Sequence, residues 1–157
     1  HGIVRATRDI DIIAAVRPEH IQTLVGELEA AYYADAQQIR DALATGRAFN
    51  LIHYASSYKF DVFPLRHDAY SQEQFRRRVC ERTSQFGAEM ELPVVSPEDI
   101  ILAKLSWFGA GGEVSDRQWS DVLGVVKVQG GHLDVAYLRK WSEWLRVTDL
   151  LDKALAG

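Results

Sequence analysis

Two short segments of the chain alternate acidic and apolar residues, as strands with one buried face do. Residues 9–13 are Asp-Ile-Asp-Ile-Ile, and residues 59–63 are Lys-Phe-Asp-Val-Phe. Because successive side chains of a strand point to opposite faces, Asp9 and Asp11 share one face, and Asp61 points away from its two apolar neighbours. If the apolar faces pack into one core, the three carboxylates converge on the opposite side.

The remaining pattern predicts an α+β fold. Pro18 suits the first turn of a helix, Asp35 and Gly46 suit a helix cap and stop, and Ser71 and Ser96 are placed as N-caps. We predict a mixed α/β part over residues 1–95 and a helical C-terminal subdomain over residues 96–157. The predicted strands are 9–15, 49–54, 58–65, 80–86 and 88–94, and the predicted helices are 18–31, 35–44, one starting at Ser71, 97–109, 115–128, 134–145 and 148–155.

Length and composition narrow the function classes. The 157 residues suit one domain or a domain with a small appendage, and the net charge of −4 gives no overall basic footprint for nucleic acid. The basic run Arg76–Arg78 is interpreted as a solvated edge. The single Cys80 excludes a disulfide scaffold, and no run is apolar enough for a membrane helix, so we expect a cytoplasmic protein without membrane contact. Because the chain starts at His1 almost directly before a strand, we expect its natural start to lie further upstream.

Three converging carboxylates need a cation. Like charges a few ångströms apart raise one another's pKa unless a positive group neutralises them. Mg²⁺ prefers oxygen ligands and is commonly shared between carboxylates and a substrate phosphate. The pattern therefore indicates metal-assisted phosphoryl or nucleotidyl transfer, with Asp9, Asp11 and Asp61 as metal ligands.

Further charged residues have two interpretations each. Lys104 lies among apolar positions of its predicted helix, where it either holds a nucleotide phosphate or extends its amine to water. Arg117 and Asp121 are spaced for a helix salt bridge, which is either purely structural or a brace for Lys104. Arg5 and Thr7 precede the first acidic strand, where they could attract phosphates. The alternative is that the charge of Arg5 only balances other charges in a loop.

Taken together, these residues resemble a known family. Arg5-Ala6-Thr7-Arg8-Asp9-Ile10-Asp11, Phe60-Asp61-Val62, Ser96-Pro97-Glu98-Asp99 with Lys104, and Asp121 are similar to the motifs of minimal nucleotidyltransferases of the polymerase-beta-like superfamily. The likeness is greatest to the bacterial abortive-infection and toxin–antitoxin group, and it extends over nearly the whole chain.

The resemblance implies a mixed sheet flanked by helices and a helical C-terminal part. It implies transfer of a nucleoside monophosphate from a nucleoside triphosphate to a hydroxyl of a protein, a tRNA or a small molecule, with two Mg²⁺ ions. Asp9, Asp11 and Asp61 would be catalytic and metal-binding. Arg5, Thr7, Lys104 and Asp121 would belong to the substrate site.

The chain departs from the family in one respect. The family has a glycine-rich, phosphate-binding turn about ten residues before the acidic pair, whereas only eight residues precede Asp9 here. A catalytically silent binding module, such as a toxin–antitoxin component, is therefore the alternative, and apolar surface exposed by the missing turn would favour a homodimer. A metal-dependent phosphohydrolase is a third hypothesis.

Overall fold

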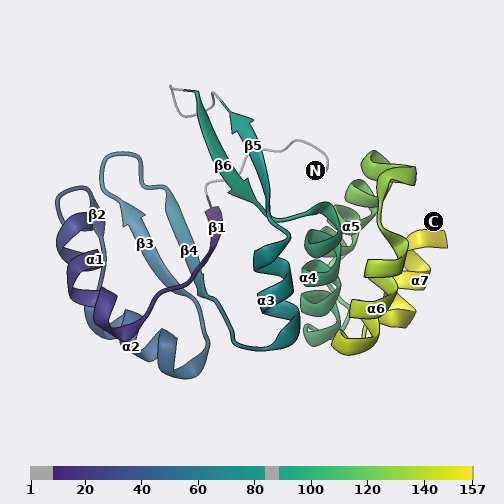
Figure 1. Ribbon diagram of the computed structural model, residues 1–157, viewed down its shortest axis with the longest axis horizontal. Helices are drawn as coiled ribbons and strands as arrows, with labels where there is room; N and C mark the ends of the chain where they lie inside the picture. The colour runs from purple at the N-terminus through teal and green to yellow at the C-terminus, as the bar shows by residue number, and fades with distance from the viewer. Residues whose placement is uncertain (1–8, 84–88, 157) are drawn as a thin grey trace. The chain divides into compact units, whose positions relative to one another are not determined.

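The computed structural model describes residues 9–83 and 89–156, with only the backbone of Asp9 (Figure 1). The chain forms two compact units that meet in the sequence between Gln72 and Glu73. We call the described residues 9–72 the sheet unit, and residues 73–83 with 89–156 the helical unit. Over these residues the chain has seven α-helices and two small sheets, which confirms the predicted mixed α+β class.

The sheet unit contains a four-stranded sheet with strand order β1-β4-β3-β2. Strand β1 runs parallel to β4, whereas β3 is antiparallel to both of its neighbours. Parallel pairing of β1 with β4 requires a crossover, and the helices between them supply it. The elements are β1 (Asp9–Ala14), η1 (Pro18–His20), α1 (Ile21–Leu28), β2 (Tyr32–Tyr33), α2 (Ala36–Thr45), β3 (Phe49–His53) and β4 (Lys59–Pro64).

The core of the sheet unit lies between one face of this sheet and helices α1 and α2. Phe49 and Val62 are register partners on β3 and β4, and both are buried. They pack with Ile21 of α1 and with Ile39 and Ala42 of α2. Since side chains alternate along a strand, burying this face directs the intervening polar residues to the other face.

Most elements of the sheet unit agree with the sequence prediction. The hairpin of β3 and β4 is confirmed, and α2 is capped as expected, with Asp35 accepting a hydrogen bond from the Gln38 amide and Gly46 in the left-handed region at φ 67°. The helix predicted over 18–31 is shorter, because it begins as a 3-10 turn and ends at Leu28. The two-residue strand β2 was not predicted, since it is too short to show an alternation.

The helical unit combines a two-stranded hairpin with a bundle of helices. Helix α4 is its centre, since Ile101, Leu102 and Leu105 are fully buried, and Leu138 of α6 and Leu151 of α7 are equally buried. Helix α3 starts in the sheet unit and ends in the helical unit. The elements are α3 (Ala69–Arg76), β5 (Val79–Thr83), β6 (Met90–Val94), α4 (Pro97–Ala110), α5 (Asp116–Gln129), η2 (Gly130–His132), α6 (Val135–Leu145) and α7 (Thr148–Ala156).

Helix starts in this part follow the predicted chemistry with one exception. Ser96 caps α4 by accepting a hydrogen bond from the Asp99 amide, with Pro97 in the first helical position. The prediction that Ser71 caps α3 is wrong. Asp68 accepts hydrogen bonds from both the amide and the hydroxyl of Ser71, so the helix begins earlier, at Ala69.

The boundary between the two compact units differs from the predicted boundary between the α/β part and the helical subdomain. The units divide at residues 72–73, so β5 and β6 group with the helices that follow them. The assignment of residues 1–95 and 96–157 to separate functional parts stays a prediction. Residues 84–86 of the predicted strand 80–86 and residue 88 of the strand 88–94 lie outside the described residues. In the described part of the chain, no helix has the length and apolar character to cross a bilayer.

Candidate functional site

Polar residues of three neighbouring strands lie in register on the sheet face opposite the core. Asp11 of β1 is the register partner of Asp61 of β4, and Asn50 of β3 is the partner of Asp61 on its other side. Register partners in adjacent strands project to the same face, and Lys59, two residues before Asp61, shares that face. We call Asp11, Asn50, Lys59 and Asp61 the polar face.

Parallel pairing brings the two acidic strands together. Asp9 is the register partner of Lys59, so a basic position of β4 lies beside the first acidic position of β1. The backbone register therefore places the two predicted acidic segments side by side, although about fifty residues separate them in the sequence. Arg5, Thr7 and the side chain of Asp9 lie outside the described residues.

Asp61 has a hydrogen-bond partner at each carboxylate oxygen. Asn50 Nδ2 donates to its Oδ1 at 2.7 Å, and Lys59 Nζ lies 3.0 Å from its Oδ2. The Asp61 side chain is 20% exposed, and that of Lys59 is 41% exposed. Partial burial raises the pKa of Asp61, but the hydrogen bonds from Asn50 and Lys59, together with the lysine charge, outweigh it and hold this pKa below its ordinary value.

The donor set of the polar face suits a hard cation in type. Asp11 and Asp61 supply carboxylate oxygens on adjacent strands, which is the ligand chemistry that Mg²⁺ prefers. No group of three acidic, histidine or cysteine side chains that could hold a metal occurs among the described residues, which do not include the Asp9 side chain. A site with three carboxylate ligands would therefore depend on the side chain of Asp9.

A second pair of predicted residues meets in the helical unit. Lys104 of α4 donates a hydrogen bond from Nζ to Asp121 Oδ2 of α5 at 2.8 Å, and both side chains are about a quarter exposed or less. The amine is thus held by a carboxylate of the neighbouring helix, seventeen residues away in the sequence. The sequence interpretation paired Asp121 with Arg117, which is exposed and one turn away on the same helix, and offered the pair as a brace for Lys104 or a phosphate. The contact between Asp121 and Lys104 agrees with the first of these two roles.

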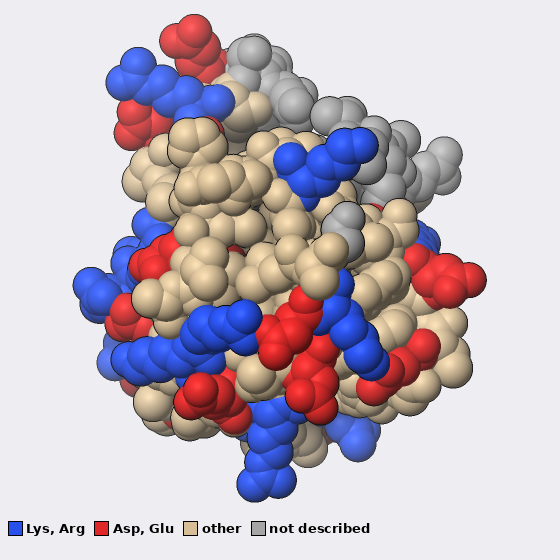
Figure 2. Space-filling model, turned by 90° about the vertical axis from the view of Figure 1, so that its right-hand side faces the viewer, with Lys and Arg blue, Asp and Glu red and all other residues tan. Residues whose placement is uncertain are grey.

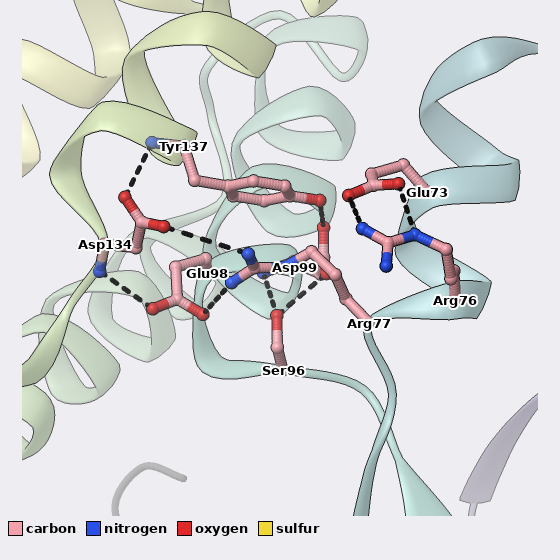
Figure 3. Close-up of polar contacts among 8 residues, drawn as sticks. All are labelled: Glu73, Arg76, Arg77, Ser96, Glu98, Asp99, Asp134 and Tyr137. Atoms are coloured by element: carbon pink, nitrogen blue, oxygen red, sulfur yellow. Dashed lines mark hydrogen bonds and ion pairs between the residues drawn. The ribbon is translucent and has the colours of Figure 1, made fainter.

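A buried polar network at the start of α4 was not anticipated. Asp99 is fully buried, and it accepts hydrogen bonds from Ser96 Oγ at 2.8 Å and from Tyr137 Oη at 2.7 Å (Figure 3). Burial and the hydrogen bond to Asp99 raise the pKa of Tyr137 far above its ordinary value, so its hydroxyl remains a donor. Sequence reasoning placed Asp99 only as an acid in the first helical turn.

Arg77 joins this network instead of lying on a solvated edge. Its guanidinium lies 3.4 Å from Glu98 Oε2 and 3.8 Å from Asp134 Oδ2, and 3.8 Å from the ring centre of Tyr137 (Figure 3). Glu98 Oε1 also accepts a hydrogen bond from the Asp134 amide at 2.9 Å. No sequence signal separated Arg77 from its basic neighbours, because Glu98 and Tyr137 lie 21 or more residues away along the chain.

The face of the molecule in Figure 2 carries acidic and basic side chains interspersed. Elsewhere in the helical unit, Arg139 of α6 and Asp152 of α7 form an ion pair across the two helices. Over the described residues of this face, the charges do not gather into one basic field of the kind that binds nucleic-acid backbone.

Comparisons with known proteins do not identify a relative. No family model matches the chain, and neither a curated protein nor a solved structure matches it. The functional assignment therefore depends on the residues of this chain.

Proposed function

We propose that the protein is a metal-dependent nucleotidyltransferase that moves a nucleoside monophosphate from a nucleoside triphosphate to an acceptor hydroxyl. The observation that carries this proposal is the register of Asp11 with Asp61 on adjacent parallel strands. It brings together two carboxylates from segments that are distant in the sequence. Asp9 lies two residues before Asp11 on β1, in register with Lys59. Such a concentration of acidic groups on one sheet face is costly unless it serves a cation or a positively charged partner.

Asp9, Asp11 and Asp61 are the residues that would hold Mg²⁺. When bound there, the metal supplies charge neutralisation for the triphosphate and lowers the pKa of the acceptor hydroxyl. In the transfer, the bond from the acceptor oxygen to the α-phosphorus forms, the bond from the α-phosphorus to the bridging oxygen breaks, and pyrophosphate leaves. Asp61 is the carboxylate proposed to receive the hydroxyl proton.

A role for Lys104 and Asp121 at a substrate phosphate stays a prediction from the resemblance, because both residues belong to the helical unit and the three aspartates belong to the sheet unit. The hydrogen bond from Lys104 to Asp121 orients the ammonium in a partly buried position. Arg5 and Thr7 are proposed to add positive charge and a hydroxyl donor before β1. The acceptor class, whether protein, tRNA or small molecule, is left to experiment.

The test is transfer of label from each α-³²P nucleoside triphosphate, with and without Mg²⁺, to protein, tRNA and small hydroxyl compounds. Asp11→Asn and Asp9→Asn should abolish label transfer, because an amide cannot replace a charged ligand. Asp41→Asn, at an exposed position of α2, is the matched control and should retain full transfer. Unchanged circular dichroism would show that the two inactive variants are folded. Full transfer by both the Asp9 and Asp11 variants would refute the assignment.

The second candidate is a catalytically silent module that acts by protein contact, such as a toxin–antitoxin component or a homodimer. One observation favours it, namely that both oxygens of Asp61 already have protein donors. Titration calorimetry with each triphosphate separates the two candidates. Absence of nucleotide binding with and without Mg²⁺ would support the silent module, and light scattering would give its oligomeric state.

A further inference from the structure

The ammonium of Lys59 lies where the proposed site needs a cation. Its Nζ is 3.0 Å from Asp61 Oδ2, and the backbone of the same residue is in register with Asp9. Asn50 donates to the other oxygen of Asp61, Oδ1, at 2.7 Å. A divalent ion that binds Asp61 must therefore share Oδ1 with an amide or replace the ammonium at Oδ2.

Lys59 is the easier of the two donors to displace. Its side chain is 41% exposed and has a flexible four-carbon stem, so its ammonium can reach solvent by a change of side-chain rotamer. The Asn50 side chain is short and lies on the inner strand β3, and its hydrogen bond to Asp61 is part-buried. Displacement at Oδ2 consequently costs less than loss of the bond at Oδ1.

The charge of Lys59 matters as much as its position. A positive group 3.0 Å from a carboxylate oxygen stabilises the ionised form of that carboxylate without any metal. The same positive group repels a divalent ion approaching that carboxylate. Lys59 thus stabilises the metal-free polar face and weakens its affinity for a metal.

We propose that Lys59 is an internal counter-ion that competes with the divalent cation for Asp61. This inference rests on the proposed function, since it concerns the cation site of that reaction. Metal entry releases the ammonium from Oδ2, and a released ammonium next to the carboxylates is placed to contact a phosphate of an incoming nucleotide. When no metal–nucleotide complex is present, the lysine charge offsets one of the carboxylate charges of the site.

The test is binding of Mn²⁺ alone, measured from the free-ion signal in electron paramagnetic resonance. Mn²⁺ accepts the same carboxylate ligands as Mg²⁺. Lys59→Met should bind Mn²⁺ about threefold to tenfold more tightly than the wild type, as expected for removing a part-exposed like charge from a divalent site. Lys59→Arg keeps the charge and should bind Mn²⁺ like the wild type.

Lys127→Met is the matched control for net charge. Lys127 is an exposed lysine in the last turn of α5, and its loss should leave Mn²⁺ affinity unchanged. Thermal melts would establish that the variants fold, and Lys59→Gln serves as a second neutral variant.

The outcomes separate this inference from the proposed function. Tighter binding in both neutral Lys59 variants, or binding in them alone, supports the competition. Wild-type binding of Mn²⁺ with equal or weaker binding in Lys59→Met overturns the competition and leaves the metal site intact. Absence of binding in the wild type and in both neutral variants at millimolar Mn²⁺ overturns the metal site and this inference with it.

Discussion

The hydroxyl of Tyr137 should contribute a large share of the stability of the helical unit. Tyr137→Phe removes one oxygen atom that donates a 2.7 Å hydrogen bond to Asp99 Oδ1. The aromatic ring remains, so its contact with the Arg77 guanidinium, 3.8 Å from the ring centre, is preserved. The substitution therefore isolates the loss of a single donor to a fully buried carboxylate.

The expected loss follows from the burial of Asp99. Hydrogen bonds to charged groups contribute about 1.5–3 kcal/mol, and a buried acceptor left without its donor adds a desolvation cost. Ser96 Oγ still donates to Oδ2, so Asp99 keeps this side-chain donor. We expect the free energy of unfolding to fall by about 2 kcal/mol, which lowers a urea midpoint by about 1–2 M for a small domain.

Tryptophan fluorescence during urea unfolding is the appropriate assay. Trp107, Trp119, Trp141 and Trp144 all lie in the helical unit, so the signal reports that unit and not the sheet unit. Ser120→Ala is the control, because Ser120 is exposed on α5 of the same unit and loss of its hydroxyl should have little effect. A midpoint for Tyr137→Phe within the error of the control would show that the hydroxyl does not stabilise Asp99.

Three other results are expected. The pKa of Tyr137 is raised in the folded protein, so its titration leaves stability unchanged below the unfolded pKa near 10 and lowers stability as the pH rises above it. Urea midpoints measured by tryptophan fluorescence between about pH 9 and 11 should therefore fall more for the wild type than for Tyr137→Phe. Parallel curves for the two proteins would contradict this. Leu105→Ala should lower the free energy of unfolding by about 2–5 kcal/mol in the same assay, because Leu105 is fully buried at the centre of the helical unit, and a loss under 1 kcal/mol would mean that the site collapses without a cavity. Asn50→Ala should raise the pKa of Asp61 toward its ordinary value in a carbon-13 carboxyl titration, since it removes a hydrogen bond that stabilises the charged form, and an unchanged pKa would leave Lys59 as the dominant partner.

Local pattern was sufficient for most of the elements. The start of α4 at Ser96-Pro97 and the cap of α2 at Asp35 depend on residues within one turn, so they were predicted correctly. The start of α3 was misplaced because Asp68 competes with Ser71 for the same capping role, and both suit it in isolation. Strand β2 has only two residues, so its existence depends on pairing with β3 and leaves no periodic trace.

The candidate site was predictable in part for the same reason. Alternation alone put Asp11 and Asp61 on the faces opposite their apolar neighbours, and this remains true in the structure. The two hydrogen-bond partners of Asp61 were not predicted. Asn50 belongs to a different strand, and Lys59 was noted only as the first residue of its segment. Helical spacing paired Asp121 with Arg117 and suggested a brace for Lys104, and the structure shows Lys104 of the preceding helix in direct contact with Asp121.

Local pattern in the sequence was enough to indicate the apolar face of most strands and helices, because these periodicities depend on backbone geometry over a few residues, but it did not indicate the burial of Asp99. Tertiary structure alone decided that β1 lies parallel to β4 with Asp11 opposite Asp61, and that Arg77, Glu98 and Tyr137 meet at the start of α4. These contacts join positions that are twenty or more residues apart. Their formation depends on how whole elements pack and on closing the chain between them, and a local pattern contains neither.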